Sequence, residues 1–214
     1  MPISYETRIM KAAFDGVNAL TADEAVELKA VVPKIATLAR TMQGLGYAHT
    51  DKSLEALARY SLGYGIGITG GVGTGKTYFF ETLRTALTRL RPQAHYTLPD
   101  LRIVRLWEFS KNHIGEILDY FANLYRTDIV LDDLGCEGMF NDYGEKYFLI
   151  TRLLDDRCNS IARTCWTTNL DGKGLADYYD DDRIIDRLKA NGGRMIQFAG
   201  CSRRKAVRHK GLFA

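Results

Sequence analysis

The apolar positions of the first 62 residues recur every three or four places, a spacing that predicts helices and no strand. Thr21, with Glu24 three residues later, has the capping-box pattern of a helix start, and Gly44 is expected to end that helix. A third helix is expected to end near Leu62. This region either packs against the rest of the chain or forms a small helical module for a partner.

Beyond residue 64 the pattern changes to short apolar runs, which predict buried strands, separated by stretches with helical spacing. The expected strands are Ile66–Ile68, His95–Thr97, Leu101–Leu106, Asp128–Gly135, Ile161–Thr168 and Met195–Phe198. The expected helices are Thr77–Leu90, Trp107–Leu124, Asp142–Asn159 and Leu175–Ala190. This alternation predicts an α/β protein with a doubly wound parallel sheet, whose ligands bind at the carboxyl ends of the strands.

The turn after the first expected strand reads G-x-x-x-x-G-K-T and is typical of a phosphate-binding loop. Its glycines allow backbone N–H groups to turn toward an anion, and the helix that follows adds its own free N–H groups. Lys76 is expected to bind the β- and γ-phosphates of ATP, and the Thr77 hydroxyl is expected to bind Mg²⁺. The candidate nucleotide-binding residues are Gly70, Gly71, Val72, Gly73, Thr74, Gly75, Lys76, Thr77 and Tyr78.

Polar residues end two later strands, where a parallel sheet would bring them near this loop. Asp132 is the candidate partner of Mg²⁺, and Asp133 is placed to polarise a water toward the γ-phosphate. Asn169 either holds that water or simply forms a turn. Arg183 and Arg187 lie four residues apart on one helical face, so they either pair with nearby aspartates or act as an arginine finger in a neighbouring subunit.

Composition narrows the class of protein further. The chain has 214 residues, of which 46% are hydrophobic, and it contains neither an apolar run of membrane-spanning length nor a secretory h-region. The four cysteines lack metal-ligand spacing, which favours reduced thiols and a cytoplasmic location. The net charge is +3, but five basic residues and no acidic ones lie in residues 199–214. This basic segment either contacts nucleic acid or is a solvated tail.

Taken in order, five motifs resemble those of a known family of AAA+ proteins. These motifs are GGVGTGKT, IVLDDLG, TTNL, DRIIDRL and IQFAGCSRR, over about residues 52–206. The series resembles the DnaC/DnaI-type replicative helicase loaders and the IstB-type transposition ATPases. The resemblance implies a P-loop NTPase sheet of AAA+ type flanked by helices, with a small helical N-terminal region and no full C-terminal lid. It also implies domains at 1–50 (helical), 51–206 (ATPase core) and 207–214 (basic tail).

The resemblance implies a role for each motif residue. Lys76 and Thr77 would bind phosphate and Mg²⁺, Asp132 would support the metal, Asp133 would be the catalytic base, and Asn169 would be the sensor-1 residue. The implied finger is Arg187, with Arg183 beside it. Arg203 or Arg204 would sense nucleotide, although Arg203 stands where the family has an aromatic residue.

The function implied is Mg²⁺-dependent ATP hydrolysis by an oligomer that loads a replicative helicase onto single-stranded DNA. The alternatives are an IstB-like transposition helper with a transposase partner, an ATP-switched adaptor with slow turnover, and a small-molecule kinase. The kinase reading leaves Asn169 and Arg187 without a role. No membrane partner is expected.

Overall fold

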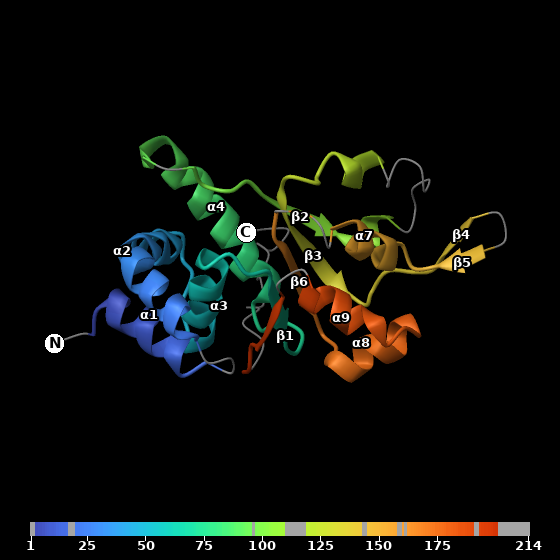
Figure 1. The fold of residues 1–214 in the computed structure, drawn as a ribbon, viewed down its shortest axis with the longest axis horizontal. Coiled ribbons are helices and arrows are strands. Elements are labelled where there is room, and N and C mark those ends of the chain that lie inside the picture. Colours follow the sequence, from blue (N-terminus) through green and yellow to red (C-terminus); the bar gives the residue numbers. More distant parts are fainter. Residues whose placement is uncertain are drawn as a thin grey trace, which may run out of the picture.

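The computed structural model describes residues 3–16, 20–95, 97–109, 119–142, 145–157, 160, 162–190 and 193–200 (Figure 1). The helices are α1 (Tyr5–Phe14), α2 (Ala22–Gly44), α3 (Asp51–Ser61), α4 (Lys76–Leu90), α5 (Leu106–Phe109), α7 (Leu149–Arg157), α8 (Gly172–Tyr179) and α9 (Arg183–Ala190), with a 3₁₀ turn, η1, at Arg91–Gln93. The strands are β1 (Ile66–Thr69), β2 (Leu101–Arg105), β3 (Asp128–Leu134), β4 (Phe140–Asp142), β5 (Glu145–Tyr147), β6 (Thr164–Thr168) and β7 (Arg194–Gln197). Among the described helices, none combines the length and the apolar character needed to cross a bilayer.

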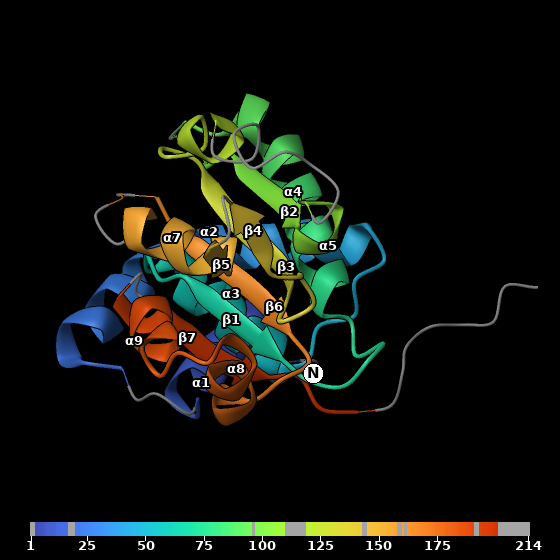
Figure 2. The ribbon, with the colours of Figure 1, turned by 90° about the vertical axis from the view of Figure 1, so that its right-hand side faces the viewer.

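Five of the strands form one parallel sheet in the order β2-β3-β6-β1-β7 (Figure 2). The carboxyl ends of these strands therefore lie along one edge, and β6 separates β1 from β3. This arrangement confirms the predicted α/β fold class, a parallel sheet flanked by helices. The expectation of a missing C-terminal lid concerns residues 201–214, which lie outside the described part of the chain.

Each face of the sheet has its own hydrophobic cluster, because side chains alternate along the strands. Val130 and Cys165 face the cluster built with α1 to α4, whereas Ile129 and Leu131 face the cluster built with α7, α8 and α9. Strand β3 is buried nearly throughout, as expected for a central parallel strand. Helices on both faces therefore hold the strand ends in fixed positions.

The Trp166 side chain, on the second face of the sheet, occupies the space that a side chain at Gly67 or Gly193 would need. A Cβ atom on Gly67 would lie 2.2 Å from Trp166 Cε2, and one on Gly193 would lie 2.1 Å from Trp166 Cη2. The indole, only 1% exposed, therefore lies against β1 where that strand has no side chain. Any larger residue at either glycine would displace the ring and create strain in the core.

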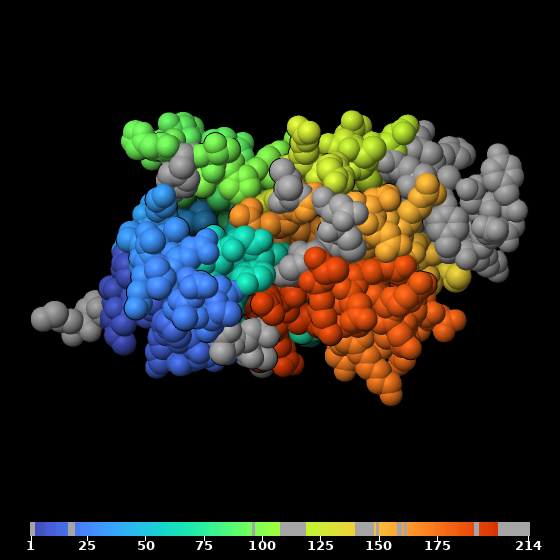
Figure 3. All heavy atoms as spheres, in the orientation of Figure 1, coloured from blue at the N-terminus to red at the C-terminus, as the bar shows by residue number. Residues whose placement is uncertain are grey.

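The N-terminal helices pack against α4 and β1 (Figure 3). The capping box of Thr21 and Glu24 is present, and α2 continues through Pro33 to its predicted end at Gly44. Buried side chains of α1, α2 and α3 share one cluster with Phe79 of α4 and with residues of β1. Residues 1–50 thus contribute to the same core as the sheet, while the predicted domain boundaries stay predictions and 207–214 lies outside the described residues.

Three predicted elements differ from the observed ones. The expected strand at His95–Thr97 is wrong, since neither of these two residues is in a strand. The expected helix from Asp142 is wrong over its first turns, where β4 and β5 form an antiparallel hairpin. Asn141, Asp142 and Gly144 are turn-forming residue types, and helical apolar spacing begins only at Phe148. Half of the expected helix Trp107–Leu124, residues 110–118, lies outside the described residues, and the described part is helical at 107–109 and 119–122.

The expected single helix Leu175–Ala190 is two helices. Asp180 adopts a left-handed conformation with φ 49°, and its N–H donates to Ala176 O, which ends α8. Asp181 then accepts from the backbone N–H of Arg183 at 3.0 Å, at the start of α9. Aspartate has low helix propensity and favours such terminal positions, so the run of three aspartates breaks the helix.

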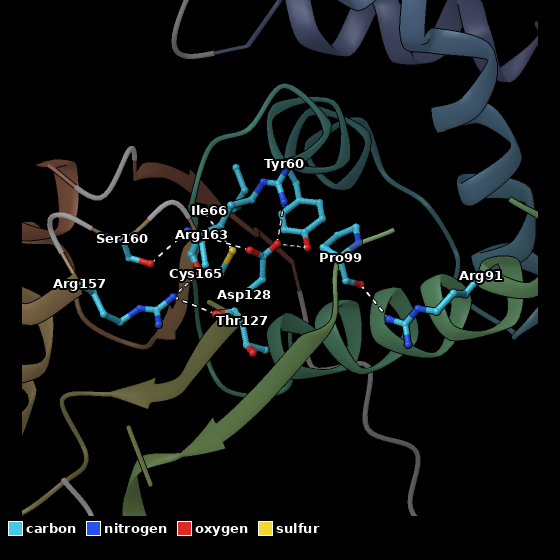
Figure 4. Close-up of polar contacts among 11 residues, drawn as sticks. Tyr60, Ile66, Arg91, Pro99, Thr127, Asp128, Arg157, Ser160, Arg163 and Cys165 are labelled. Atoms are coloured by element: carbon cyan, nitrogen blue, oxygen red, sulfur yellow. Dashed lines mark hydrogen bonds and ion pairs between the residues drawn. The ribbon is translucent and has the colours of Figure 1, made fainter. Parts of the chain in front are cut away.

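A buried polar network holds the opposite, amino-terminal end of the sheet (Figure 4). The Asp128 carboxylate accepts from Tyr60 Oη at 2.8 Å and pairs with Arg163 Nη1 at 2.7 Å. Arg157, 2% exposed, donates to Thr164 Oγ1 at 2.8 Å and to three backbone carbonyls at 2.9 to 3.1 Å. The network joins α3, β3, α7 and β6 at the end of the sheet away from the phosphate-binding loop.

Candidate active site

The loop between β1 and α4 depends on glycine at defined positions. Gly70, Gly73 and Gly75 have φ of 150°, 81° and 94°, values that other residues rarely adopt. A Cβ on Gly70 would also approach Phe198 O to 2.2 Å. Gly75 is the N-cap of α4, with no side-chain cap and no acidic residue in the first turn of the helix. The N-terminal N–H groups of α4 are therefore left to bind an anion such as a phosphate.

Lys76 links this loop to the tip of β6. Its ammonium group donates to Gly70 O at 2.7 Å, to Gly71 O at 3.0 Å and to Asn169 Oδ1 at 2.7 Å. Lys76 is 6% exposed, so its charge acts where water screens it little. The structure thus brings together two candidate residues that are 93 positions apart in the sequence.

Thr77 and Asp132 form the second contact between the loop and the sheet. Thr77 Oγ1 donates to Asp132 Oδ1 at 2.9 Å, and Asp132 is 4% exposed at the end of β3. A hydroxyl and a carboxylate are hard oxygen ligands, and Mg²⁺ commonly uses few protein ligands together with waters and phosphates. The pair fits that role, and the described residues contain no group of three or more His, Cys, Asp or Glu side chains arranged for a metal.

Asp133 lies in a strained part of β3. Its φ is 60°, and the register of β3 against β6 shifts between Leu131 and Leu134, as in a β-bulge. A left-handed conformation of a non-glycine residue costs roughly 1–3 kcal/mol and persists where surrounding contacts hold it. Here the Asp133 N–H donates to Thr167 Oγ1 at 2.9 Å. Thr167 received no role from the sequence, although it stands in the TTN motif beside Asn169.

The other candidate loop residues differ in exposure. Thr74 is 3% exposed and donates to Gly71 O at 2.9 Å, which closes the loop on itself. Val72 lies exposed on the rim of the loop. Tyr78 is partly exposed and packs its ring 5.5 Å from that of Tyr47, in the segment between α2 and α3. Their contacts with a nucleotide stay predictions.

The two candidate finger arginines have different surroundings on α9. Arg187 is held by two carboxylates, Asp155 of α7 at 2.5 Å and Asp181 at 2.5 Å, and its side chain is 15% exposed. Among the described residues, Arg183 pairs with Asp181 alone, at 3.0 Å, and its side chain is 77% exposed. The intrachain pairing expected as the alternative to a finger is therefore present for both. Arg203 and Arg204 lie outside the described residues.

A buried cluster ties the segment after Asp133 to α8. Glu137, 3% exposed, accepts from the Gly135 N–H at 3.0 Å and from the Tyr179 hydroxyl, while the Tyr178 hydroxyl donates to the Glu137 carbonyl. Burial raises the pKa of Glu137 above its usual value, and burial likewise raises the pKa of the nearby Cys136 thiol. Cys136 is exposed, and the carboxylates of Asp133 and Glu137 add to the effect of desolvation on its pKa.

The raised pKa of Glu137 predicts a pH dependence of folding. The folded protein binds this proton more tightly than the unfolded chain, so the contribution of Glu137 to stability is fully present below the unfolded pKa, near 4.5, and falls as pH rises toward the folded pKa. We expect Glu137→Gln to remove this contribution, by up to about 1.4 kcal/mol per pH unit within that window. Urea denaturation of both proteins from pH 4 to pH 8 measures it, and parallel stability curves would contradict it.

Comparison with known proteins gives structural neighbours only. No family model matches the sequence, and no curated protein matches it. The fold is similar to a crystal structure of DnaI, with 21% identity over 95% of this chain and 94% of that chain and a TM-score of 0.48. It is also similar to AMPPCP-bound DnaA from Aquifex aeolicus, with 16% identity over 74% of this chain and 49% of that one and a TM-score of 0.49.

Proposed function

We propose that this chain is an ATPase of DNA replication that loads a replicative helicase onto single-stranded DNA as an oligomer. The observation that carries the ATPase part is the pair of contacts Lys76–Asn169 and Thr77–Asp132, which join the start of α4 to the carboxyl ends of β6 and β3. The helicase-loading part rests on the order of the five sequence motifs, and the identity of the partner follows from that resemblance alone.

The proposed mechanism assigns one task to each residue. The loop N–H groups and Lys76 bind and orient the phosphates, and Thr77 with Asp132 would hold Mg²⁺, which neutralises charge on the phosphate oxygens. Asp133 accepts a hydrogen bond from the attacking water, and Asn169 fixes the orientation of that water. Little covalent chemistry is asked of the protein, since positioning and electrostatic stabilisation supply most of the rate in phosphoryl transfer.

The proposed site is completed by an arginine from a neighbouring subunit. Arg187 remains the proposed finger, although it would first have to exchange the carboxylates of Asp155 and Asp181 for a phosphate. Arg183, one turn earlier and mostly exposed, would have to leave Asp181, its one ion-pair partner in the described part of the chain, and is the second candidate. An arginine finger contributes roughly 10³- to 10⁵-fold to the rate.

Arg183→Ala and Arg187→Ala separate the two candidates. We expect the ATPase rate per protomer of the unaltered protein to rise with protein concentration and with single-stranded DNA. The variant that lacks the finger should lose at least a hundredfold of this rate and keep ATP binding within about threefold. The other variant should retain most of its activity, and thermal melting of both checks that the lost ion pairs have not unfolded them.

Mixing two inactive variants tests whether the finger acts between subunits. A Lys76→Met protomer keeps its arginine, and an arginine-to-alanine protomer keeps its loop, so mixed oligomers contain some complete sites. Activity recovered on mixing supports the proposal. Full hydrolysis by a dilute monomeric preparation of Arg183→Ala/Arg187→Ala would overturn it.

A further inference from the structure

Thr167 is a fully buried residue whose hydroxyl touches both aspartates of the site. Thr167 Oγ1 donates to Asp132 Oδ1 at 2.8 Å and accepts from the Asp133 N–H at 2.9 Å. A threonine hydroxyl has one proton to donate and lone pairs to accept with, so both bonds form at once. The result is a continuous chain from the Asp133 backbone through Thr167 to the Asp132 carboxylate.

The place of Thr167 in the sheet makes this contact rigid. It lies on β6 between β1 and β3, and its Cα is paired with that of Ile68 on β1. The shift in register between Leu131 and Leu134 leaves the Asp133 N–H outside the regular ladder, and Thr167 supplies its acceptor. A side chain without a hydroxyl would leave that N–H without this partner.

Thr167 also bears on the proposed metal ligand. Asp132 Oδ1 accepts from Thr77 at 2.9 Å as well as from Thr167, so two hydroxyls fix the orientation of one carboxylate. We propose that Thr167 is a positioning residue that sets Asp132 for Mg²⁺ and holds Asp133 in its left-handed conformation. This inference rests on the proposed ATPase function for its catalytic consequence, whereas the positioning of the Asp133 backbone is independent of it.

Three substitutions on β6 test the proposal. Thr167→Val removes the hydroxyl at nearly constant volume, and Thr167→Ser restores it. Thr164→Val is the matched control, because Thr164 is equally buried on the same strand and its hydroxyl accepts from Arg157 at the opposite end of the sheet. It removes a buried hydroxyl of the same kind without touching either aspartate.

We expect Thr167→Val to lower the rate of turnover and to leave ATP binding nearly unchanged. Thr167→Val should bind ATP within about threefold of the unaltered protein in EDTA, but its kcat should fall at least tenfold and its half-saturating Mg²⁺ concentration should rise at least threefold. Thr167→Ser and Thr164→Val should stay within about threefold in kcat and unchanged in Mg²⁺ dependence. A Thr167→Val protein with normal kcat and normal Mg²⁺ dependence overturns the catalytic part.

Backbone hydrogen exchange gives a second measurement that needs no nucleotide. The Asp133 amide should be protected in the unaltered protein, in Thr167→Ser and in Thr164→Val, and should exchange at least tenfold faster in Thr167→Val while Val130 stays protected. Equal exchange in all four proteins overturns the positioning role. If the unaltered protein hydrolyses no ATP at any concentration, the proposed function fails, and this exchange measurement still decides the role of Thr167.

Discussion

Replacing Lys76 by methionine will weaken ATP binding by roughly a hundredfold or more. Methionine keeps most of the length of the side chain but removes the charge, and charged hydrogen bonds of this kind contribute about 3 kcal/mol when little water screens them. Lys76 is 6% exposed, and its ammonium group lies between the loop carbonyls and Asn169. Titration with a fluorescent ATP analogue measures the dissociation constant.

The matched control for this substitution is Lys189→Met. The Lys189 side chain is 68% exposed on α9, where its weak pairing with Asp186 contributes little. The Lys189→Met protein should bind ATP with unchanged affinity. If circular dichroism shows that both proteins are folded, equal ATP binding by the Lys76→Met and unaltered proteins would mean that the loop does not bind the nucleotide.

Arg157→Met is expected to destabilise the fold by about 3 to 5 kcal/mol. The substitution keeps a long apolar stem but removes one donor each from the Thr164 hydroxyl and from the carbonyls of Leu124, Thr127 and Arg163. The Leu124 and Arg163 carbonyls keep a backbone donor each. These groups lie in the interior, where water does not replace the lost donor. Urea denaturation followed by circular dichroism measures the free energy of unfolding.

An exposed arginine provides the comparison for that value. Arg102 is 60% exposed on β2 and pairs with Asp100 on the surface, so Arg102→Met should change stability by less than about 0.5 kcal/mol. A loss below about 1 kcal/mol for Arg157→Met would mean that the surrounding segments rearrange to satisfy their own polar groups.

Local patterns in the sequence predicted most of the fold and most of the site. The glycine positions, the apolar run before Asp132 and the Thr21–Glu24 capping box each depend on neighbouring residues only, and all three are present in the structure. Parallel strand order then explains why Asn169 and Lys76 meet. The sequence therefore indicated which candidate residues the fold would bring together, and their roles toward a nucleotide stay predictions.

The features that the sequence did not predict depend mostly on contacts between residues that are distant in the chain. The break between α8 and α9 depends on Asp180 accepting a left-handed conformation, which helical spacing alone does not reveal. The carboxylate of Asp155, 32 residues away, binds Arg187 from another helix. Thr167 has an inconspicuous residue type for a site, and its role depends on a register shift between strands. The contacts of Arg187 and Thr167 join residues 32 and 34 positions apart, which no local pattern reveals, whereas the helix break is local but leaves the apolar spacing unchanged.

The strand order also has a consequence for how the chain folds during synthesis. Strands β2 and β3 can pair as soon as both emerge, but β1 pairs only with β6 and β7, so it waits for about 95 further residues. At roughly 5–20 residues per second this delay is ~5–20 s, during which β1 is an unpaired edge. Because β6 then contacts β1 and β3 together, Thr164–Thr168 joins the two parts of the sheet and brings the candidate site residues together, and β7 adds at the edge afterwards.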